Sequence, residues 1–318
     1  MINKKLGLMF LLAGCAVGKI VAGDFNSYAN EDVLVCFRNG ATYNLVVDAG
    51  PISTLTNASP NARIPITQFS AAQFNTAFGG VDGLDWSAFT WNTNDSTLFV
   101  SRARTSLNTQ STPWSANNAG LQSGVAQNMS TIPGGADYIF NNATISPSTA
   151  ASVIEPQASS GYLAGTGQSY FDALFGGLPL PDFGGTFPGD PEISTPAGFD
   201  SSGTVVRSDF YQIPPGSGTH NVKYLGYFEF APDGSMAFVL PIAVPVIKSI
   251  SRSSNVSTIN YTAGLYGTYT LRGTNTLSSG TASINWPAIT TLTSGDTSVH
   301  TYMDTDSGAN KFYIITAQ

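Results

Sequence analysis

The chain is short of charged residues, and that shortage limits its partners. Charged residues make up 10% of the 318 residues, whereas an average soluble domain carries ~25%. The 13 basic residues are outnumbered by 20 acidic ones, which gives a net charge of −7. Because nucleic-acid binding rests on cationic contacts to phosphates, this balance predicts that nucleic acid is not a partner.

Cysteine is also scarce, so disulfides are not expected to hold the fold. Cys15 and Cys36 are the only two cysteines, and Cys15 falls in an N-terminal segment with the pattern of an export signal. Cys36 is then left without a partner, and the fold must rest on burial of apolar side chains. The apolar residues 33–37 around it predict a buried structural thiol rather than a nucleophile.

Histidine is rarer still, which argues against common catalytic sites. Only His220 and His300 could serve a Ser-His-acid site, and the chain has no Gly-x-Ser-x-Gly motif and no paired metal-ligand spacing. The sequence therefore predicts no catalytic residue. Glycoside hydrolysis needs only two facing carboxylates, so a glycan-active enzyme stays open as a third hypothesis. The candidate carboxylates for such an enzyme are Glu155, Asp182, Asp190, Glu192 and Glu229, and the sequence singles out none of them.

The N-terminal residues 1–23 predict export. Lys4 and Lys5 precede the uncharged apolar run 6–13, which has the length of a signal peptide core and is too short for a membrane span. Two processing sites compete, because residues 12–15 have the form of a lipobox ending at Cys15, whereas residues 21–23 suit an ordinary signal peptidase. We therefore expect a bacterial extracellular or cell-surface protein, either free or lipidated at Cys15 as an outer-membrane lipoprotein.

The rest of the chain predicts a mainly β protein of two domains. Residues 24–240 are expected to form a larger, β-sandwich-like domain with short peripheral helices, in which the Ser-, Thr-, Gly- and Pro-rich stretch 141–203 forms loops. Residues 241–245, with a proline at each end, read as a stiff linker. Residues 246–318 hold short alternating segments separated by turns, the pattern of a small β-sandwich without a transmembrane span.

Local signals place elements within the larger domain. Asn39-Gly40 separates two β-rich runs and predicts a tight hairpin. Residues 70–73 fit a capping box, with Gly79 as the stop of a short amphipathic helix. A second helix is expected after Ser115, and residues 231–234 predict another hairpin turn.

Two sets of residues are candidates for ligand binding. Trp91, Trp114 and Tyr162 lie in or near predicted loops and could stack on sugar rings, although burial in a core explains most aromatic residues. Asp304 and Asp306 resemble the start of a calcium loop, but no acid follows where its bidentate ligand belongs, so a plain turn between strands is favoured. No cofactor is expected, and Ca²⁺ is the only alternative.

Four segments carry a resemblance to a known family: 31–38, 43–50, 85–86 and 224–230, followed by the turn 233–234. They resemble exported proteins of verrucomicrobial and related bacteria, many of which end in a PEP-CTERM sorting tail. This resemblance implies a place in the cell envelope or extracellular matrix. The chain ends at Gln318 without a Pro-Glu-Pro motif, so we expect retention at the cell, if any, to come from lipid at Cys15 or from non-covalent contacts.

The C-terminal residues carry a second resemblance. Residues 269–271, 277–278, Trp286 and 312–315 resemble the fibronectin type III or immunoglobulin-like module that often ends such proteins. The leading hypothesis is therefore an exported, non-enzymatic structural, adhesive or extracellular-matrix protein. Its expected partners are further copies of itself or other surface components, with self-assembly through unpaired edge strands as one route. The alternative is a carbohydrate-binding protein whose partner is a polysaccharide.

Overall fold

The computed structural model describes residues 24–40, 42–107, 109–157, 167–175, 182–184, 189–241, 245–262, 268–276, 285–293, 299–305 and 311–317. Strands take up 44% and helices 20%, which confirms the predicted mainly β fold class. Within these residues no helix is both long and apolar enough to span a membrane. Of the predicted linker, residues 242–244 lie outside the described residues.

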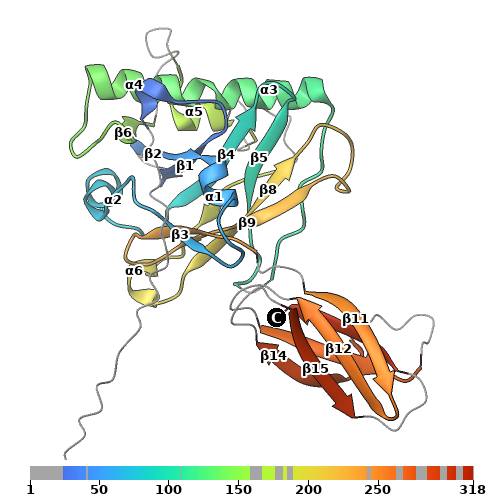
Figure 1. Ribbon diagram of the computed structural model, residues 1–318. Helices are drawn as coiled ribbons and strands as arrows, with labels where there is room; N and C mark the ends of the chain where they lie inside the picture. Colours follow the sequence, from blue (N-terminus) through green and yellow to red (C-terminus); the bar gives the residue numbers. More distant parts are fainter. Residues whose placement is uncertain are drawn as a thin grey trace, which may run out of the picture.

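The larger domain is built on one curled antiparallel sheet (Figure 1). Its strands are β1 (Asp32–Arg38), β2 (Tyr43–Pro51), β3 (Arg63–Ile66), β4 (Asp85–Asn92), β5 (Thr97–Ala103), β6 (Ser152–Pro156), β7 (Ile193–Ser194), β8 (Val206–Ile213), β9 (Lys223–Phe230) and β10 (Met236–Val239). Nine strands follow the order β3-β10-β9-β8-β5-β4-β1-β2-β6, and β7 pairs with β4. The predicted hairpins at Asn39-Gly40 and at residues 231–234 are confirmed, because β1 pairs with β2 and β9 pairs with β10.

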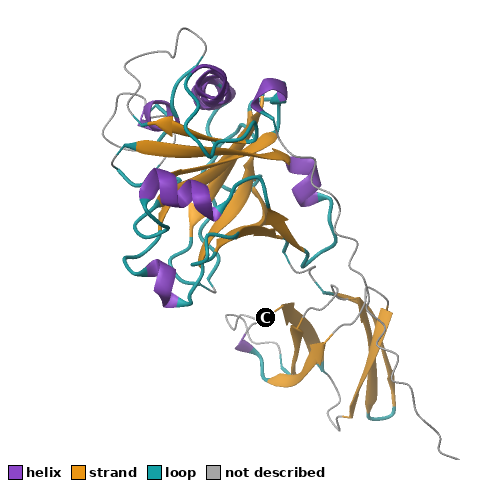
Figure 2. Cartoon of the chain, turned by 90° about the vertical axis from the view of Figure 1, so that its left-hand side faces the viewer, coloured by secondary structure: helices purple, strands orange, loops and turns teal. Residues whose placement is uncertain are grey.

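Helices cover both sides of this sheet (Figure 2). They are η1 (Phe25–Ser27), α1 (Ile52–Thr56), α2 (Ala71–Phe78), α3 (Ala119–Met129), α4 (Thr131–Asn142), α5 (Tyr170–Phe175) and α6 (Phe199–Ser202). The predicted capping box of α2 is confirmed, since the Ser70 backbone N–H donates to the Gln73 side chain at 2.9 Å, and Gly79 ends the helix with φ +78°. Two short helices, α3 and α4, follow Ser115 where one was expected.

Each side of the sheet has its own apolar core, because successive side chains of a strand point to opposite faces. Strand β1 sends Leu34 and Cys36 toward α3, α4 and α5, and it sends Val35 and Phe37 to the other side. We call the first side the helical face. The second, the aromatic face, packs rings such as Phe37 and Phe74, whose centroids lie 4.9 Å apart. Cys36 is fully buried and has no disulfide, as its apolar neighbours predicted.

The prediction that residues 141–203 hold only loops and short helices is wrong in two places, at β6 and at the two-residue strand β7, which pairs with β4. β6 lies in this stretch and pairs with β2, with Val153 and Ile154 fully buried on opposite faces. It is an edge strand of five residues that ends at Pro156, and the edge of a sheet tolerates proline. The abundance of turn-forming residues around it therefore hid a short but buried strand.

The C-terminal residues form the predicted small β-sandwich, shown in orange and red in Figure 1. Its strands are β11 (Val246–Ser253), β12 (Val256–Thr262), β13 (Thr268–Thr274), β14 (Ala288–Thr293), β15 (Val299–Thr305) and β16 (Phe312–Ala317). They pair as two sheets, β11-β12-β15 and β14-β13-β16. Residues of both sheets, among them Ile259, Tyr261, Tyr269 and Leu271, share one apolar core.

Candidate functional site

The charged residues of the larger domain gather where the helical face turns from apolar to polar. Along β5, Leu98 and Val100 are followed on the same face by Arg102, and Arg104 comes directly after the strand. Along the antiparallel neighbour β8, Ile213 and Tyr211 give way to Asp209 and Arg207. The two strands therefore bring arginines and carboxylates together at one end of the sheet. Two groups form there, the arginine cluster and the carboxyl cluster.

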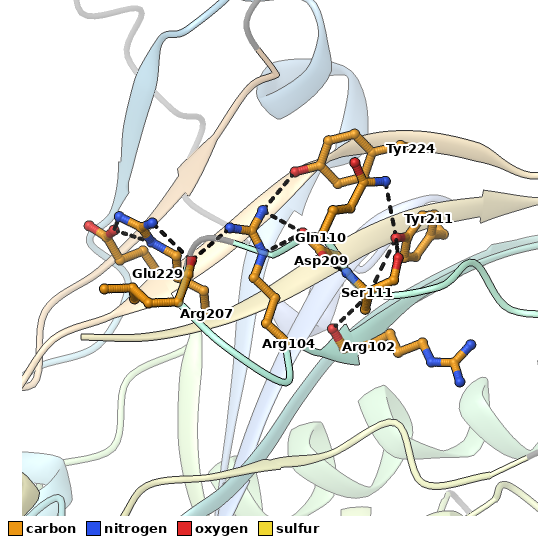
Figure 3. Close-up of polar contacts among 10 residues, drawn as sticks. Arg102, Arg104, Gln110, Ser111, Arg207, Asp209, Tyr211, Tyr224 and Glu229 are labelled. Atoms are coloured by element: carbon orange, nitrogen blue, oxygen red, sulfur yellow. Dashed lines mark hydrogen bonds and ion pairs between the residues drawn. The ribbon is translucent and has the colours of Figure 1, made fainter. Parts of the chain in front are cut away.

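The arginine cluster comprises Arg63, Arg104, Arg207, Asp209, Tyr227 and Glu229. Arg104 pairs with the fully buried Asp209 at 2.6 Å and donates to the Tyr224 hydroxyl at 3.1 Å (Figure 3). The second oxygen of Asp209 accepts the Ser111 backbone N–H at 2.6 Å. Burial lowers the pKa of Arg104, but the hydrogen bond and charge of Asp209 raise it above its usual value. Asp209 therefore binds both the Arg104 side chain and the loop that contains Ser111.

The arginine cluster extends across β8, β9 and β3, and its positive and negative side chains alternate. The Tyr227 ring lies between Arg104 and Arg207, whose guanidinium carbons are 4.3 and 5.0 Å from its centroid. Arg207 pairs with Glu229 at 2.8 Å, and Glu229 also pairs with Arg63 at 3.2 Å. Arg104 and Arg207 both donate to the Leu107 carbonyl at 3.1 Å. These contacts hold the segment after β5 on the sheet, so the arrangement is that of a structural clamp.

Replacing Asp209 with asparagine is expected to lower the free energy of unfolding by about 2 kcal/mol, the range for hydrogen bonds to charged groups. The amide cannot pair with Arg104 and serve Ser111 as the carboxylate does. Amide hydrogen exchange should speed up around Ser111 before other regions open. The control is Arg63→Ala, because its side chain is 52% exposed and the loss should stay below about 1 kcal/mol. Equal losses for the two variants would contradict the clamp.

The carboxyl cluster lies at the ends of β1 and β4 and comprises Arg38, Asp85, Glu155, Tyr170 and Glu192. Arg38 donates through Nε to Glu192 at 2.9 Å, and its terminal nitrogen lies 3.2 Å from Asp85. Tyr170, on α5, donates its hydroxyl to Glu192 at 2.7 Å. Burial raises the pKa of Glu192 to about 7, while Arg38 limits the rise. Arg38 and α5 thus hold one carboxyl inside the domain.

Glu155 is the most deeply buried acid of this cluster. One of its oxygens accepts from Asn44 at 3.1 Å and from the backbone N–H of Tyr170 at 2.6 Å, while within the described residues its other oxygen has no partner. Burial raises its pKa to about 8. A neutral carboxylic acid suits this position, because no described residue forms an ion pair with Glu155 that would compensate an ionised one. Tyr170 links the two acids, since its N–H serves Glu155 and its hydroxyl serves Glu192.

α5 reaches these acids because α4 allows a close approach. A side chain at Gly135 would place its Cβ 2.2 Å from the carbonyl oxygen of Gln168, two residues before Tyr170. Only glycine permits that contact without a shift of the backbone. Glu155 is fully buried and Glu192 is 7% exposed, so both acids lie inside the domain. A hollow of about 230 Å³ lies elsewhere and is lined by Thr93, Ser96, Ser123, Ala126, Gln127 and Ser130, which include no acid or histidine.

The proposed sugar-stacking platform needs correction. Trp91 is 4% exposed in β4 and stacks on Tyr28 with centroids 5.7 Å apart. Trp114 is 3% exposed, donates its indole N–H to the Ser101 carbonyl at 3.0 Å and lies under Arg102. Neither tryptophan presents a free face, because both complete the core of the helical face. Tyr162 lies outside the described residues.

Of the two candidate calcium ligands, Asp304 already has partners within the small sandwich. Asp304 is buried in β15, where it pairs with Lys311 at 2.7 Å and accepts from the Tyr313 hydroxyl at 2.8 Å. These partners occupy the carboxylate inside the small sandwich. Asp306, like Cys15, lies outside the described residues. Across the described ranges, no three His, Cys, Asp or Glu side chains gather as metal ligands would.

Sequence reasoning missed the arginine cluster, although a signal for it was present. In both 97–104 and 206–213, charged residues continue the alternation that apolar residues begin, so they share one face.

The two histidines lie in different domains. His220, in the larger domain, is exposed, and His300, in the small sandwich, lies beside Tyr261 with ring centroids 5.5 Å apart. Comparisons with protein-family models, curated proteins and solved structures found no match.

Proposed function

We propose that this chain is an exported, non-enzymatic structural or adhesive protein of the bacterial cell surface or extracellular matrix. The observation that carries the proposal is the internal use of its clustered charges. Arg38, Arg104 and Arg207 each pair with a carboxylate of the domain, and the two linked acids Glu155 and Glu192 are buried. Groups used in this way stabilise a scaffold and leave little for substrate.

The N-terminal pattern supplies the location in this proposal. Residues 1–23 carry the charged start and apolar run of an export signal, with Cys15 as the alternative point of lipid attachment. The resemblance to exported bacterial proteins points the same way. The carbohydrate-binding alternative has less support, because two of its three aromatic candidates, Trp91 and Trp114, are buried.

Fractionation of the source bacterium tests the proposal. We expect the chain in the envelope or extracellular-matrix fraction, and we expect cells lacking it to adhere or aggregate less. Intact-mass analysis separates the two processing routes, because a diacylglycerol adduct on Cys15 marks the lipoprotein. Recovery in the cytoplasm with residues 1–23 intact would contradict export. Turnover of any substrate in a polysaccharide panel would contradict a non-enzymatic role.

A further inference from the structure

Most of the exposed large apolar side chains among the described residues belong to the small sandwich. Among the described residues, seven large apolar side chains are exposed, and five of them belong to the small sandwich: Val246, Ile250, Val299, Met303 and Phe312. Val299 and Met303 are 59% and 66% exposed, the two highest values of the seven. Both lie on β15 and are separated by four positions, so they point to the same side of the strand. That side is the outer face of the sheet β11-β12-β15.

Hydrogen bonds between side chains confirm which residues share this outer face. Thr301, midway between Val299 and Met303, donates to Asn260 on β12 at 2.8 Å, and Asn260 donates to Ser249 on β11 at 2.9 Å. The inward-pointing residues of β12, Ile259 and Tyr261, are buried. The paired outward positions of the three strands as described carry no charged side chain, and Lys248 stands outside that register, at the shift in β11. Along β12 and β15 the face is therefore polar and uncharged, with apolar side chains at β15.

The two edges of this sheet differ in how they are protected. β11 has a register shift between Ile247 and Ser249, carries Lys248 and Arg252, and also lies against β16. Bulges and basic residues are the usual means of keeping an edge strand from pairing with another chain. β15 pairs with β12 without any shift and has no lysine, arginine or proline. Its one charged residue, Asp304, points inward to Lys311. In the described residues β15 is thus an open edge without these safeguards.

We propose that two copies of the chain pair through β15, antiparallel, with a two-fold axis at Thr301. This register places Thr301 opposite Thr301 of the second copy, and it places Val299 opposite Met303. Both exposed apolar side chains then cover each other on the outer face. His300 and Tyr302 face each other in the same way on the inner side. The sheet β11-β12-β15 of one copy and the same sheet of the second copy then form one continuous sheet of six strands.

Charge and symmetry favour a second copy as the occupant of this edge. Chains with a net charge of −7 repel each other, so they associate best through surfaces that carry no charge. The outward side of β15 is such a surface. A two-fold contact uses the same patch on both copies and closes on itself, so the product is a dimer. This inference deepens the proposed function, on which it rests, by naming the surface for self-association.

Cysteine crosslinking of the exported full-length chain tests the register. Thr301→Cys should form a disulfide-linked dimer under mild oxidation, because facing residues in antiparallel strands have Cα atoms about 4.5–5.5 Å apart. Val299→Cys and Met303→Cys should each form no disulfide-linked dimer alone, since identical positions would lie roughly 14 Å apart across the paired strands. Mixed together, these two variants should crosslink as a heterodimer, which different tags reveal. Wild type, with Cys36 buried, and Ser251→Cys on β11 are the controls and should not crosslink.

Sedimentation measures the affinity. Thr301→Lys should weaken dimerisation at least tenfold, whereas Ser251→Lys on the same face should leave it unchanged. A monomeric wild type at high concentration would overturn the pairing, and so would crosslinking of Val299→Cys alone. The results of crosslinking and sedimentation do not depend on where in the bacterium the protein is found. A monomer found in the matrix would refute only the pairing, and a dimer found in the cytoplasm would refute only the proposed function.

Discussion

Replacing Arg38 with methionine is expected to lower the free energy of unfolding by about 3–5 kcal/mol at pH 8, the cost of breaking a buried ion pair on one side. The Glu192 side chain is 2% exposed, so it would be left as a buried carboxylate held only by Tyr170. Methionine keeps an unbranched apolar stem but removes the guanidinium, whose carbon now lies 5.2 Å from the centroid of the Phe175 ring. Urea unfolding followed by tryptophan fluorescence measures the loss.

A double-mutant cycle separates the pair from packing. The double variant Arg38→Met/Glu192→Met should recover most of the stability, because it leaves no unpaired charge. Glu192→Met alone should cost less than Arg38→Met, since Asp85 remains 3.2 Å from Arg38. If the double variant were as unstable as Arg38→Met, the buried charge would not be the cause.

The second large effect is a loss of stability as pH rises from about 5 to about 8. The pKa of Glu155 is raised from 4.5 to about 8 by burial, so between these values the unfolded chain has released a proton that the folded chain still holds. The unfolded state then binds fewer protons, and the free energy of unfolding falls with pH. At 1.36 kcal/mol per pKa unit the total is on the order of 5 kcal/mol. Glu192 and Asp48, with pKa values raised by burial to about 7 and about 6, add to the same trend.

Glu155→Gln tests the origin of this slope. The amide stays neutral at every pH, so the variant should lose a large part of the decline between pH 5 and pH 8 and be more stable than wild type at pH 8. Asp200→Asn is the matched control, because Asp200 is exposed and its replacement should leave the slope unchanged. Thermal unfolding across this pH range gives the comparison. An unchanged slope in Glu155→Gln would assign the decline to other groups.

Local patterns predicted much of the fold. The hairpin at Asn39-Gly40, the capping box before α2 and the small sandwich all follow from short-range signals, and each is present. β6 was not predicted, because five residues in a stretch rich in Ser, Thr, Gly and Pro carry too little pattern of their own. Its strand character comes from pairing with β2, a contact distant in sequence.

The clusters were harder to predict than the fold for the same reason. Glu192 was a nominal acid in a loop, and nothing in its neighbours indicates Arg38 as a partner. The sequence predicts Trp91 and Trp114 in or near loops, but their exposure depends on what covers them: Trp91 is buried within β4, and Arg102 lies over Trp114. Alternation predicts which face a side chain occupies, whereas the partner on that face is set by strand order.

The order of the strands in the large sheet also determines which parts of the sheet can fold first. β3, near the start of the domain, pairs with β10, near its end, as in the contact of Pro65 with Ala237. A chain that emerges from the ribosome N-terminus first can form the β1–β2 hairpin early, but the edge formed by β3 and β10 must wait for the last strand. Contacts so distant in sequence slow folding. Until β9 arrives, aromatic residues such as Phe37 and Phe74 lack their contacts with Phe230, so the emerging chain exposes an incomplete core.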